Sequence, residues 1–260
     1  MAPMIRTVTA TRYVTPLREG GSLPAIVEAD DDGMYVLKFR GAGQGPKALI
    51  AELVAGEIGR ALDLPVPEIV LVELDGDLAR TEPDPEIQDL IRASAGLNLA
   101  LDYLPGAVAF DPVTERPAAD LASAIVWFDA YVTNVDRTPR NTNMLMWHGR
   151  LWLIDHGAAL YFHHDSSGDP VAHSRTPFER IRDHVLLPFA SALPEADTRL
   201  APRLRDDTLE SIVAAVPEGW LAAGDIEPDA MRRIYVQYLS SRLRSRHIFV
   251  EEAIRARSHL

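Results

Sequence analysis

The segment between Asn134 and Gly157 constrains this chain more than any other. It places one aspartate, Asp136, five residues before an asparagine, Asn141, and a second aspartate, Asp155, fourteen residues after that asparagine. The five residues before Asp155, Arg-Leu-Trp-Leu-Ile, are mainly apolar and predict a strand. Carboxylate and carboxamide oxygens are the ligands that a hard cation such as Mg²⁺ prefers. The spacing therefore predicts a loop and a strand end that bring these side chains to one metal ion.

Each half of this pattern has an ordinary explanation when taken alone, because Asp, Asn and Gly are common in turns for backbone reasons. Both halves in this order, separated by a strand, are typical of kinases. In that interpretation Asp136 receives or orients the proton of the attacking hydroxyl, while Asn141 and Asp155 hold Mg²⁺ on the nucleotide phosphates. Fixed carboxylates and metal supply the positioning and charge neutralisation that phosphoryl transfer requires.

The apolar pattern divides the chain into a strand-rich first part and a mainly helical remainder. In the first part we expect an antiparallel meander of three strands, one helix and two further strands, at 8–16, 23–29, 34–39, 48–62, 69–74 and 97–104. In the remainder we expect three helices and a strand pair, at 118–132, 206–216, 228–257 and 143–154. These elements predict an α+β, two-lobed protein-kinase-like fold. Its N-terminal lobe (1–104) would bind nucleotide phosphates, and its helical C-terminal lobe (105–260) would carry the catalytic loop, metal ligands and acceptor site.

Two charged residues in the first part fit the same interpretation. Lys38 ends the third predicted strand, and Glu52 lies early in the helix that follows. A lysine and a glutamate in this order form the ion pair that steadies the nucleotide phosphates in kinases, so we predict catalytic roles for both. The alternatives are a solvent-facing strand lysine and a solvated helix glutamate, with Glu57 as a second candidate partner.

Glycines near the N-terminus predict a loop that covers the phosphates. Gly20, Gly21 and Ser22 lie between the first two predicted strands, and glycine lets backbone N–H groups approach phosphate oxygens closely. The same residues would also make an ordinary hairpin turn. The glycine-rich stretch 41–47 is a poorer candidate, because Pro46 stands where a phosphate-binding P-loop needs its second glycine.

Composition narrows the function classes. The formal net charge of −12 argues against nonspecific binding to nucleic acid or to acidic membranes. The chain has no cysteine, which excludes disulfides, thiolate metal sites and a cysteine nucleophile. We see neither a secretory signal at the start nor an apolar run of membrane-spanning length, so we expect a cytoplasmic protein. The arginine-rich stretch 232–257 predicts a solvated helix face or, alternatively, a docking surface for an acidic partner.

The catalytic segment resembles that of the HipA-like kinases, relatives of phosphatidylinositol 3/4-kinases and of protein kinases. The resemblance is carried by Asn134-x-Asp136-Arg137-x-x-x-Asn141, by Asp155-His156-Gly157, and by the stretch from Glu52 to Leu64-Pro65-Val66-Pro67. The order Asp-Arg is telling, since most protein kinases have His-Arg-Asp there. His156 replaces the phenylalanine that follows the metal-binding aspartate in protein kinases, so their aromatic switch is not expected here.

The resemblance implies a binding mode for the nucleotide. ATP would lie between the two lobes, with its adenine against the connecting segment at Asp102, Tyr103 and Leu104. Lys38 would contact the phosphates. Mg²⁺ would lie on the asparagine and the second aspartate identified above, and the first aspartate would orient the acceptor hydroxyl.

We therefore predict a kinase that uses ATP and Mg²⁺ and transfers the γ-phosphoryl group to a hydroxyl, with a protein serine or threonine as the favoured acceptor and a small molecule as the other possibility. One alternative is a nucleotide-binding pseudokinase that acts as a regulatory module. Another is a small-molecule phosphotransferase of the antibiotic-kinase type. Those enzymes usually have His-x-Asp in the catalytic loop, whereas this chain has Asn134-Val135-Asp136.

Overall fold

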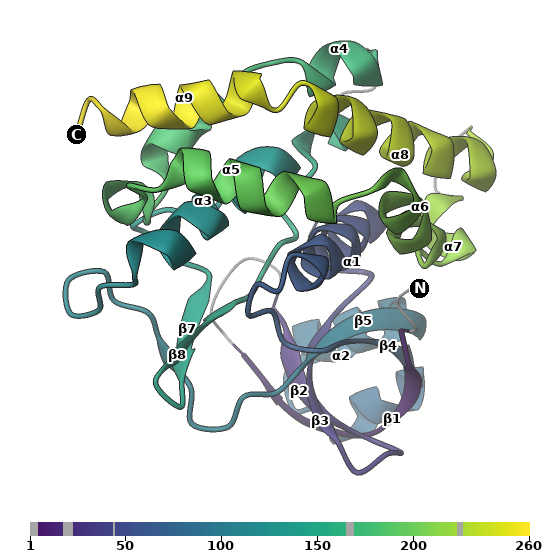
Figure 1. The fold of residues 1–260 in the computed structure, drawn as a ribbon. Helices are drawn as coiled ribbons and strands as arrows, with labels where there is room; N and C mark the ends of the chain where they lie inside the picture. Colours follow the sequence, from purple (N-terminus) through teal and green to yellow (C-terminus); the bar gives the residue numbers. More distant parts are fainter. Residues whose placement is uncertain (1–4, 18–22, 44, 165–168, 223–225) are drawn as a thin grey trace.

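A closed β-barrel made from the first part of the chain lies at one end of the molecule, and helices from the later sequence form the other end (Figure 1). The computed structural model describes residues 5–17, 23–43, 45–164, 169–222 and 226–260. Helix α1 (Pro46–Ala61) lies between the two ends, in contact with barrel strands on one side and with later helices on the other. The protein is thus mixed α+β, with the β-rich N-terminal region and helical C-terminal region that the apolar pattern predicts.

The barrel has the strand order β1-β2-β3-β5-β4. Its strands are β1 (Thr7–Pro16), β2 (Ala25–Ala29), β3 (Met34–Lys38), β4 (Ile69–Leu74) and β5 (Gly96–Asp102). The antiparallel β1-β2-β3 meander confirms the prediction. The ring closes because β1 also pairs in parallel with β4, with Thr7 opposite Leu71, which the sequence analysis did not predict. Two register shifts in β1 within residues 10–15 give it the bend that closure requires.

Strand β3 presents its two faces to different surroundings. Tyr35 and Leu37 are buried and belong to the apolar cluster that fills the barrel. Lys38 lies on the opposite face, because successive side chains of a strand alternate between faces. The alternation expected from the sequence therefore directs this lysine out of the barrel, toward α1.

The connection between β4 and β5 contains two elements that the sequence analysis did not predict. They are a 3₁₀ helix, η1 (Gly76–Thr81), and a helix, α2 (Pro85–Ala93). The Asp84 side chain accepts a hydrogen bond from the Glu86 backbone N–H and so caps α2. Ile87 and Ile91 are buried in the barrel cluster, whereas most of the helix is exposed. The apolar residues Ile87, Leu90 and Ile91 lie at helical spacing in this short segment, a signal that the sequence analysis did not use.

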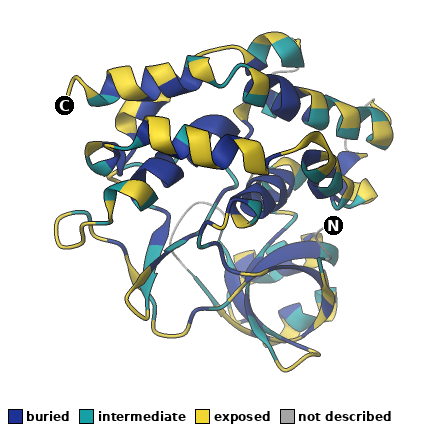
Figure 2. Cartoon of the chain, viewed as in Figure 1, coloured by how far each residue is buried: buried dark blue, intermediate teal, exposed yellow. Residues whose placement is uncertain are grey.

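The C-terminal region packs around helix α3. Its helices are α3 (Ala119–Val132), α4 (Pro170–Ser174), α5 (Leu193–Leu200), α6 (Asp206–Ala214), α7 (Glu218–Leu221), α8 (Pro228–Arg244) and α9 (His247–Arg257). A small antiparallel sheet joins β6 (Val108–Ala109), β7 (Met144–Trp147) and β8 (Arg150–Leu153). Helix α3 is buried from residue 122 onward, while the outer helices expose one side (Figure 2). None of the helices among the described residues combines the length and apolar character needed to cross a bilayer.

The arginine-rich C-terminus differs from the expectation in two respects. The predicted helix 228–257 is two helices, because α8 ends at Arg244 and α9 begins at His247. Arg242 is not part of a solvated face, since it is only 1 % exposed. It donates to the carbonyl oxygens of Ala130 and Tyr131 at 2.7 and 2.8 Å, and lies over the Phe249 ring. A guanidinium whose donors all find carbonyl acceptors can be buried, and the apolar pattern alone does not show this.

We predict that Arg242→Lys lowers the free energy of unfolding by about 2–3 kcal/mol. Arg242 satisfies carbonyl groups in the last turn of α3 and also those of Ser174 and Thr176. An ammonium group cannot reach all of them, and a buried unsatisfied acceptor costs about 1–3 kcal/mol. Urea denaturation measures the change. Arg244→Lys, at an exposed position two residues away, is the control and should change stability by less than about 0.5 kcal/mol.

Candidate active site

Three predicted residues meet in one cluster between the barrel and the helical region. Lys38 Nζ lies 2.5 Å from Glu52 Oε2 on α1, and it also donates to Asp155 Oδ1 just after β8. The Glu52 side chain is fully buried, whereas 42 % of the Asp155 side chain is exposed. Glu57, the second candidate partner, pairs with Arg60 instead. The predicted Lys38–Glu52 ion pair is therefore present.

Opposite charges keep this cluster ionised in spite of its burial. Burial alone would lower the pKa of Lys38, but the charges of Glu52 and Asp155 outweigh it and raise that pKa. Burial would likewise raise the pKa of Glu52, but the charge of Lys38 and a contact with His156 hold it well below its usual range. A protonated lysine held at a fixed place can neutralise phosphate oxygens, which is what a nucleotide site requires.

His156 supports this cluster from inside the protein, a role that the sequence did not reveal. Its ring is fully buried, with Nδ1 3.2 Å from Glu52 Oε1 and an edge-on contact to Phe128 of α3. The residue thus links α1 to α3 at the position where protein kinases have a phenylalanine. A histidine between an aspartate and a glycine gives little indication of burial in the sequence.

The predicted catalytic loop, residues 134–143, forms a second cluster around Asp136. Asn141 Nδ2 donates to Asp136 Oδ2 at 2.7 Å, and Asn143 Nδ2 donates to the same oxygen at 3.2 Å. The Asp136 backbone N–H donates to Asn134 Oδ1. Two carboxamides therefore orient this half-buried carboxylate through Oδ2, and neither of them contacts Oδ1. Asn143 was missed in the sequence analysis, although it follows Asn141 by two residues.

A buried ion pair holds the catalytic loop on the helical region. Asp129 of α3 accepts hydrogen bonds from Arg137 Nε at 2.6 Å, His184 Nε2 at 2.9 Å and Asn134 Nδ2 at 3.0 Å. Both members of the Asp129–Arg137 pair have fully buried side chains. A lone aspartate in the apolar helix sequence Ala-Ile-Val-Trp-Phe-Asp-Ala-Tyr-Val is a signal that the sequence analysis did not use.

The two clusters adjoin because the residues next to them hydrogen-bond to each other. The Ile154 backbone N–H donates to the Asn143 carbonyl oxygen at 3.0 Å. The Arg137 guanidinium donates to the carbonyl oxygens of both residues. Asp155 and Asn143 have positive φ values of 56° and 47°, a left-handed conformation that Asp and Asn tolerate better than most residues. The backbone thus brings the Asp155 segment beside the loop of Asp136.

The segment predicted to face adenine leaves the end of β5. The Asp102 backbone N–H donates to the Glu68 carbonyl oxygen, and the Tyr103 N–H donates to the Met34 carbonyl oxygen. Those two amides are engaged within the protein, and the Leu104 side chain is buried. Trp147 of β7 donates from Nε1 to the Pro105 carbonyl oxygen at 3.0 Å, which ties the segment to the small sheet.

Two further parts of the prediction concern the phosphates and the metal. Gly20, Gly21 and Ser22, the predicted phosphate-covering loop, lie outside the described residues. No group of three or more His, Asp or Glu among the described residues could hold a metal ion on its own. Mg²⁺ does not need one, since it is bound by one or two protein oxygens together with phosphates and water. The exposed carboxylate of Asp155 and the carboxamide of Asn141 are of the donor type it prefers.

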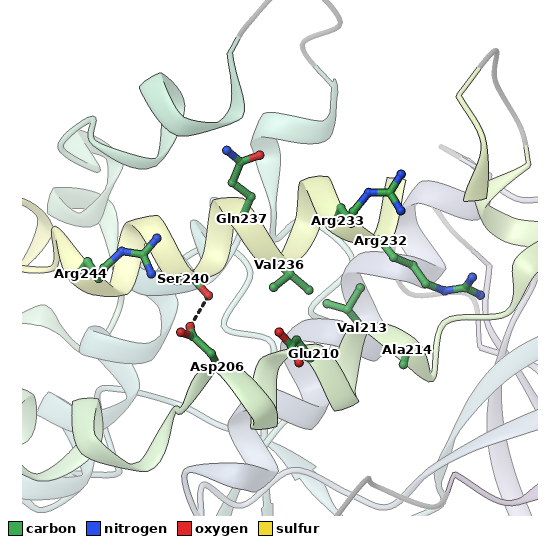
Figure 3. A pocket seen from close by; sticks show the side chains of 10 residues that line it. All are labelled: Asp206, Glu210, Val213, Ala214, Arg232, Arg233, Val236, Gln237, Ser240 and Arg244. Carbon is green, nitrogen blue, oxygen red and sulfur yellow. Dashed lines mark hydrogen bonds between the residues drawn. The ribbon is translucent and has the colours of Figure 1, made fainter. Parts of the chain in front are cut away.

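Two hollows of the described surface lie elsewhere. One of about 500 Å³ runs between α6 and α8 (Figure 3). There the Ser240 hydroxyl donates a hydrogen bond to Asp206 Oδ1, and Arg232, Arg233 and Arg244 lie along α8. Another of about 380 Å³ lies beside the small sheet. Neither is lined by the residues of the two clusters.

A barrel with a lysine–glutamate pair, next to a loop that holds an aspartate and an asparagine, is the arrangement of a kinase-type phosphotransferase. The chain belongs to the HipA-like kinase family, whose model matches residues 11–247. The protein is a kinase, and the family that the catalytic motifs predicted is confirmed.

One solved structure supports this fold, and two more distant ones are also similar to the chain. The Helicobacter pylori proinflammatory kinase CtkA is similar with a TM-score of 0.59 and 14% identity, over 98% of this chain and 99% of that one. Two structures of the Golgi casein kinase, one with Mn/ADP bound, have TM-scores of 0.47 and 0.46, each at 14% identity and over 94% of this chain. They are covered over 74% and 72% of their own lengths. No curated protein sequence matches the chain at a significant level.

We predict that Asp129→Asn lowers the free energy of unfolding at pH 7 by about 3–5 kcal/mol, because it leaves the buried Arg137 charge uncompensated. Burial would raise the pKa of Asp129, but the Arg137 charge and the His184 hydrogen bond hold it far below the ordinary 3.8. The unfolded chain therefore binds more protons at acid pH, so this stabilisation is fully present well above pH 3.8 and is lost progressively as the pH falls from 3.8 toward the lower pKa of the folded protein.

Urea denaturation from pH 7 down to pH 3.5 measures both effects. The difference between wild type and Asp129→Asn should be constant near neutrality and begin to shrink at the acid end. Asp120→Asn, on an exposed position in the first turn of the same helix, is the control. A difference that stays below 1 kcal/mol at pH 7 contradicts the role assigned to the buried pair.

Proposed function

We propose that this kinase uses Mg-ATP and transfers the γ-phosphoryl group to a hydroxyl, most readily that of a serine or threonine in a protein. The observation that carries the proposal is the position of Lys38. It is held by buried Glu52 and by partly exposed Asp155, and the Asp155 segment is hydrogen-bonded to the loop of Asp136. Each residue type is the one that the corresponding role requires.

In this proposal each charged residue has one task. Lys38 neutralises phosphate oxygens, and Glu52 keeps its ammonium group in place. Asp136 orients the acceptor hydroxyl, whose oxygen attacks the γ-phosphorus as the bond to the β,γ-bridging oxygen breaks. ADP leaves, and the hydroxyl proton passes to Asp136 or to water. Bound Mg²⁺ supplies charge neutralisation on the phosphates, held by Asp155 and Asn141.

We also propose that the fold works as two lobes, residues 1–104 and 105–260, with the nucleotide between them. Support comes from the ion pair of Lys38 with Asp155, which joins the barrel to the helical region. In this arrangement adenine lies against Asp102, Tyr103 and Leu104, and Gly20, Gly21 and Ser22 cover the phosphates. Mg-ATP would then take over part of the contact that Lys38 now makes with Asp155.

We predict that Asp136→Asn lowers the rate of ADP formation from Mg-ATP about a hundredfold, while the affinity for Mg-ATP changes by less than about threefold. Losing one preorganised group in a transition state costs about 3 kcal/mol. A coupled assay of ADP release and calorimetric titration give the two quantities, with Asp120→Asn as the exposed control. If Asp136→Asn formed ADP at the wild-type rate, the role proposed for Asp136 would be wrong. A wild-type protein that binds Mg-ATP and never forms ADP or a phosphorylated product would instead be a pseudokinase.

We predict that Asp155→Asn weakens the binding of Mg-ATP about tenfold or more but changes the binding of metal-free ATP much less. The substitution removes the charge that holds the metal, and hydrogen bonds and contacts to charged groups contribute about 1.5–3 kcal/mol. Asparagine also tolerates the left-handed backbone at this position, so strain does not confuse the result. Calorimetry with and without Mg²⁺ distinguishes the two cases, and equal losses in both would contradict a metal-binding role.

A further inference from the structure

Arg140 lies at the tip of a rigid turn beside the catalytic aspartate. The Thr138 N–H donates to the Asn141 carbonyl oxygen at 2.9 Å, and the Asn141 N–H donates back to the Thr138 carbonyl oxygen at 3.1 Å. Pro139 occupies the other tip position and restricts the backbone through its fixed φ. The next residue, Asn141, bonds directly to Asp136. The turn thus fixes the position of the Arg140 backbone close to Asp136.

The two cations of the adjoining clusters, Lys38 and Arg137, already have partners. Lys38 is shared by two carboxylates, and Arg137 is buried against Asp129. The Arg140 side chain is exposed, and no described residue pairs with it or accepts a hydrogen bond from it. Its charge is therefore available to a molecule that comes from solvent.

The positive charge of Arg140 contrasts with the negative charge of the rest of the molecule. The formal net charge is −12, and the site itself contains the carboxylates of Asp136, Asp155 and Glu52. An acidic substrate would be repelled by most of this surface, and a free cation at the tip of the catalytic loop supplies a local attraction. The guanidinium also has the planar donor geometry that pairs with carboxylate or phosphate groups.

The nucleotide and the acceptor place different demands on the site. Lys38 already faces the phosphates from the barrel side and is positioned by its own carboxylate partners. Asp136 is the residue that meets the acceptor hydroxyl in the proposed function. The turn that carries Arg140 is hydrogen-bonded to Asp136 through Asn141, and the Arg140 side chain is exposed and makes no hydrogen bond or ion pair with the Lys38 cluster. Its geometry therefore favours contact with the acceptor.

We propose that Arg140 is a specificity-determining residue that selects acceptor segments with an anionic side chain near the hydroxyl to be phosphorylated. This inference rests on the proposed function. The anion is a carboxylate or the phosphate of an already modified residue. A cation of this exposure pairs with modest strength, so the preference for an anionic over a neutral neighbour is about two- to fivefold, and it weakens as salt is added.

The test uses the purified full chain, γ-labelled Mg-ATP and a peptide library with one central serine or threonine. In each pool one flanking position is fixed as alanine, glutamate, phosphoserine or lysine. Wild type should label pools with glutamate or phosphoserine at one particular position most strongly, and which of the two is preferred identifies the source of the anion. Arg140→Glu should reverse the preference at that position toward lysine, with an unchanged KM for ATP.

Arg150→Glu is the matched control, since Arg150 is also exposed and also adjoins a tight turn, at the start of β8. It should keep the wild-type profile. Two further measurements cover the case in which the charge reversal disturbs the loop. Both Arg140→Ala and rising NaCl concentrations with the wild-type protein should reduce the preference for the anionic pools. Unfolding midpoints check that each variant is folded.

Several results would overturn the inference. They are a wild-type profile without an anionic preference, the same preference in Arg140→Glu, ADP formation without labelling of any pool, or a KM for ATP that rises equally with every peptide. The last result would assign Arg140 to the nucleotide. Failure of the proposed function looks different, because wild type would then form no ADP from Mg-ATP and label nothing, even in a cell extract.

Discussion

The ion pair that Lys38 shares between Glu52 and Asp155 is the interaction on which the site depends. It joins a barrel strand, the helix that follows it and the segment after β8, which lies 117 residues after Lys38 in the sequence. An ammonium group removed from water is tolerated only when opposite charges surround it. The same requirement that stabilises these buried charges also positions a cation at the boundary between the two regions, where the phosphates are proposed to lie.

A second charged network has the complementary task. Asp129, Arg137 and His184 are buried together and fasten the catalytic loop to α3, and Arg242 fastens the end of α3 to the start of the last helices. Lys38 and Asp155 retain some exposure, so a ligand can compete for their contacts. The Asp129 and Arg137 side chains, in contrast, are fully buried. The protein therefore separates a rigid support from a part that can respond to binding.

Much of this arrangement follows from short-range patterns. The strand alternation around Lys38 and the antiparallel meander depend on local spacing, and they agree with the structure. Barrel closure through β1 and β4 was not visible, because parallel pairing joins strands about sixty residues apart and leaves no local pattern. The burial of Arg242, Asp129 and His156 depends on partners that only the fold supplies, and periodicity treats such residues as exposed.

The closed barrel has a consequence for how this kinase can meet other proteins. Each strand in the ring β1-β2-β3-β5-β4 pairs with two others, with β1 pairing with β4 over Thr7–Thr9 and with β2 over Ala10–Pro16, so the described barrel has no end strand whose whole length is open to a passing strand. An edge of that kind invites another chain to extend the sheet, whether as a specific partner or as an aggregate. The described barrel is therefore better suited to recognising other molecules through side chains and loops than through the addition of a strand to its sheet.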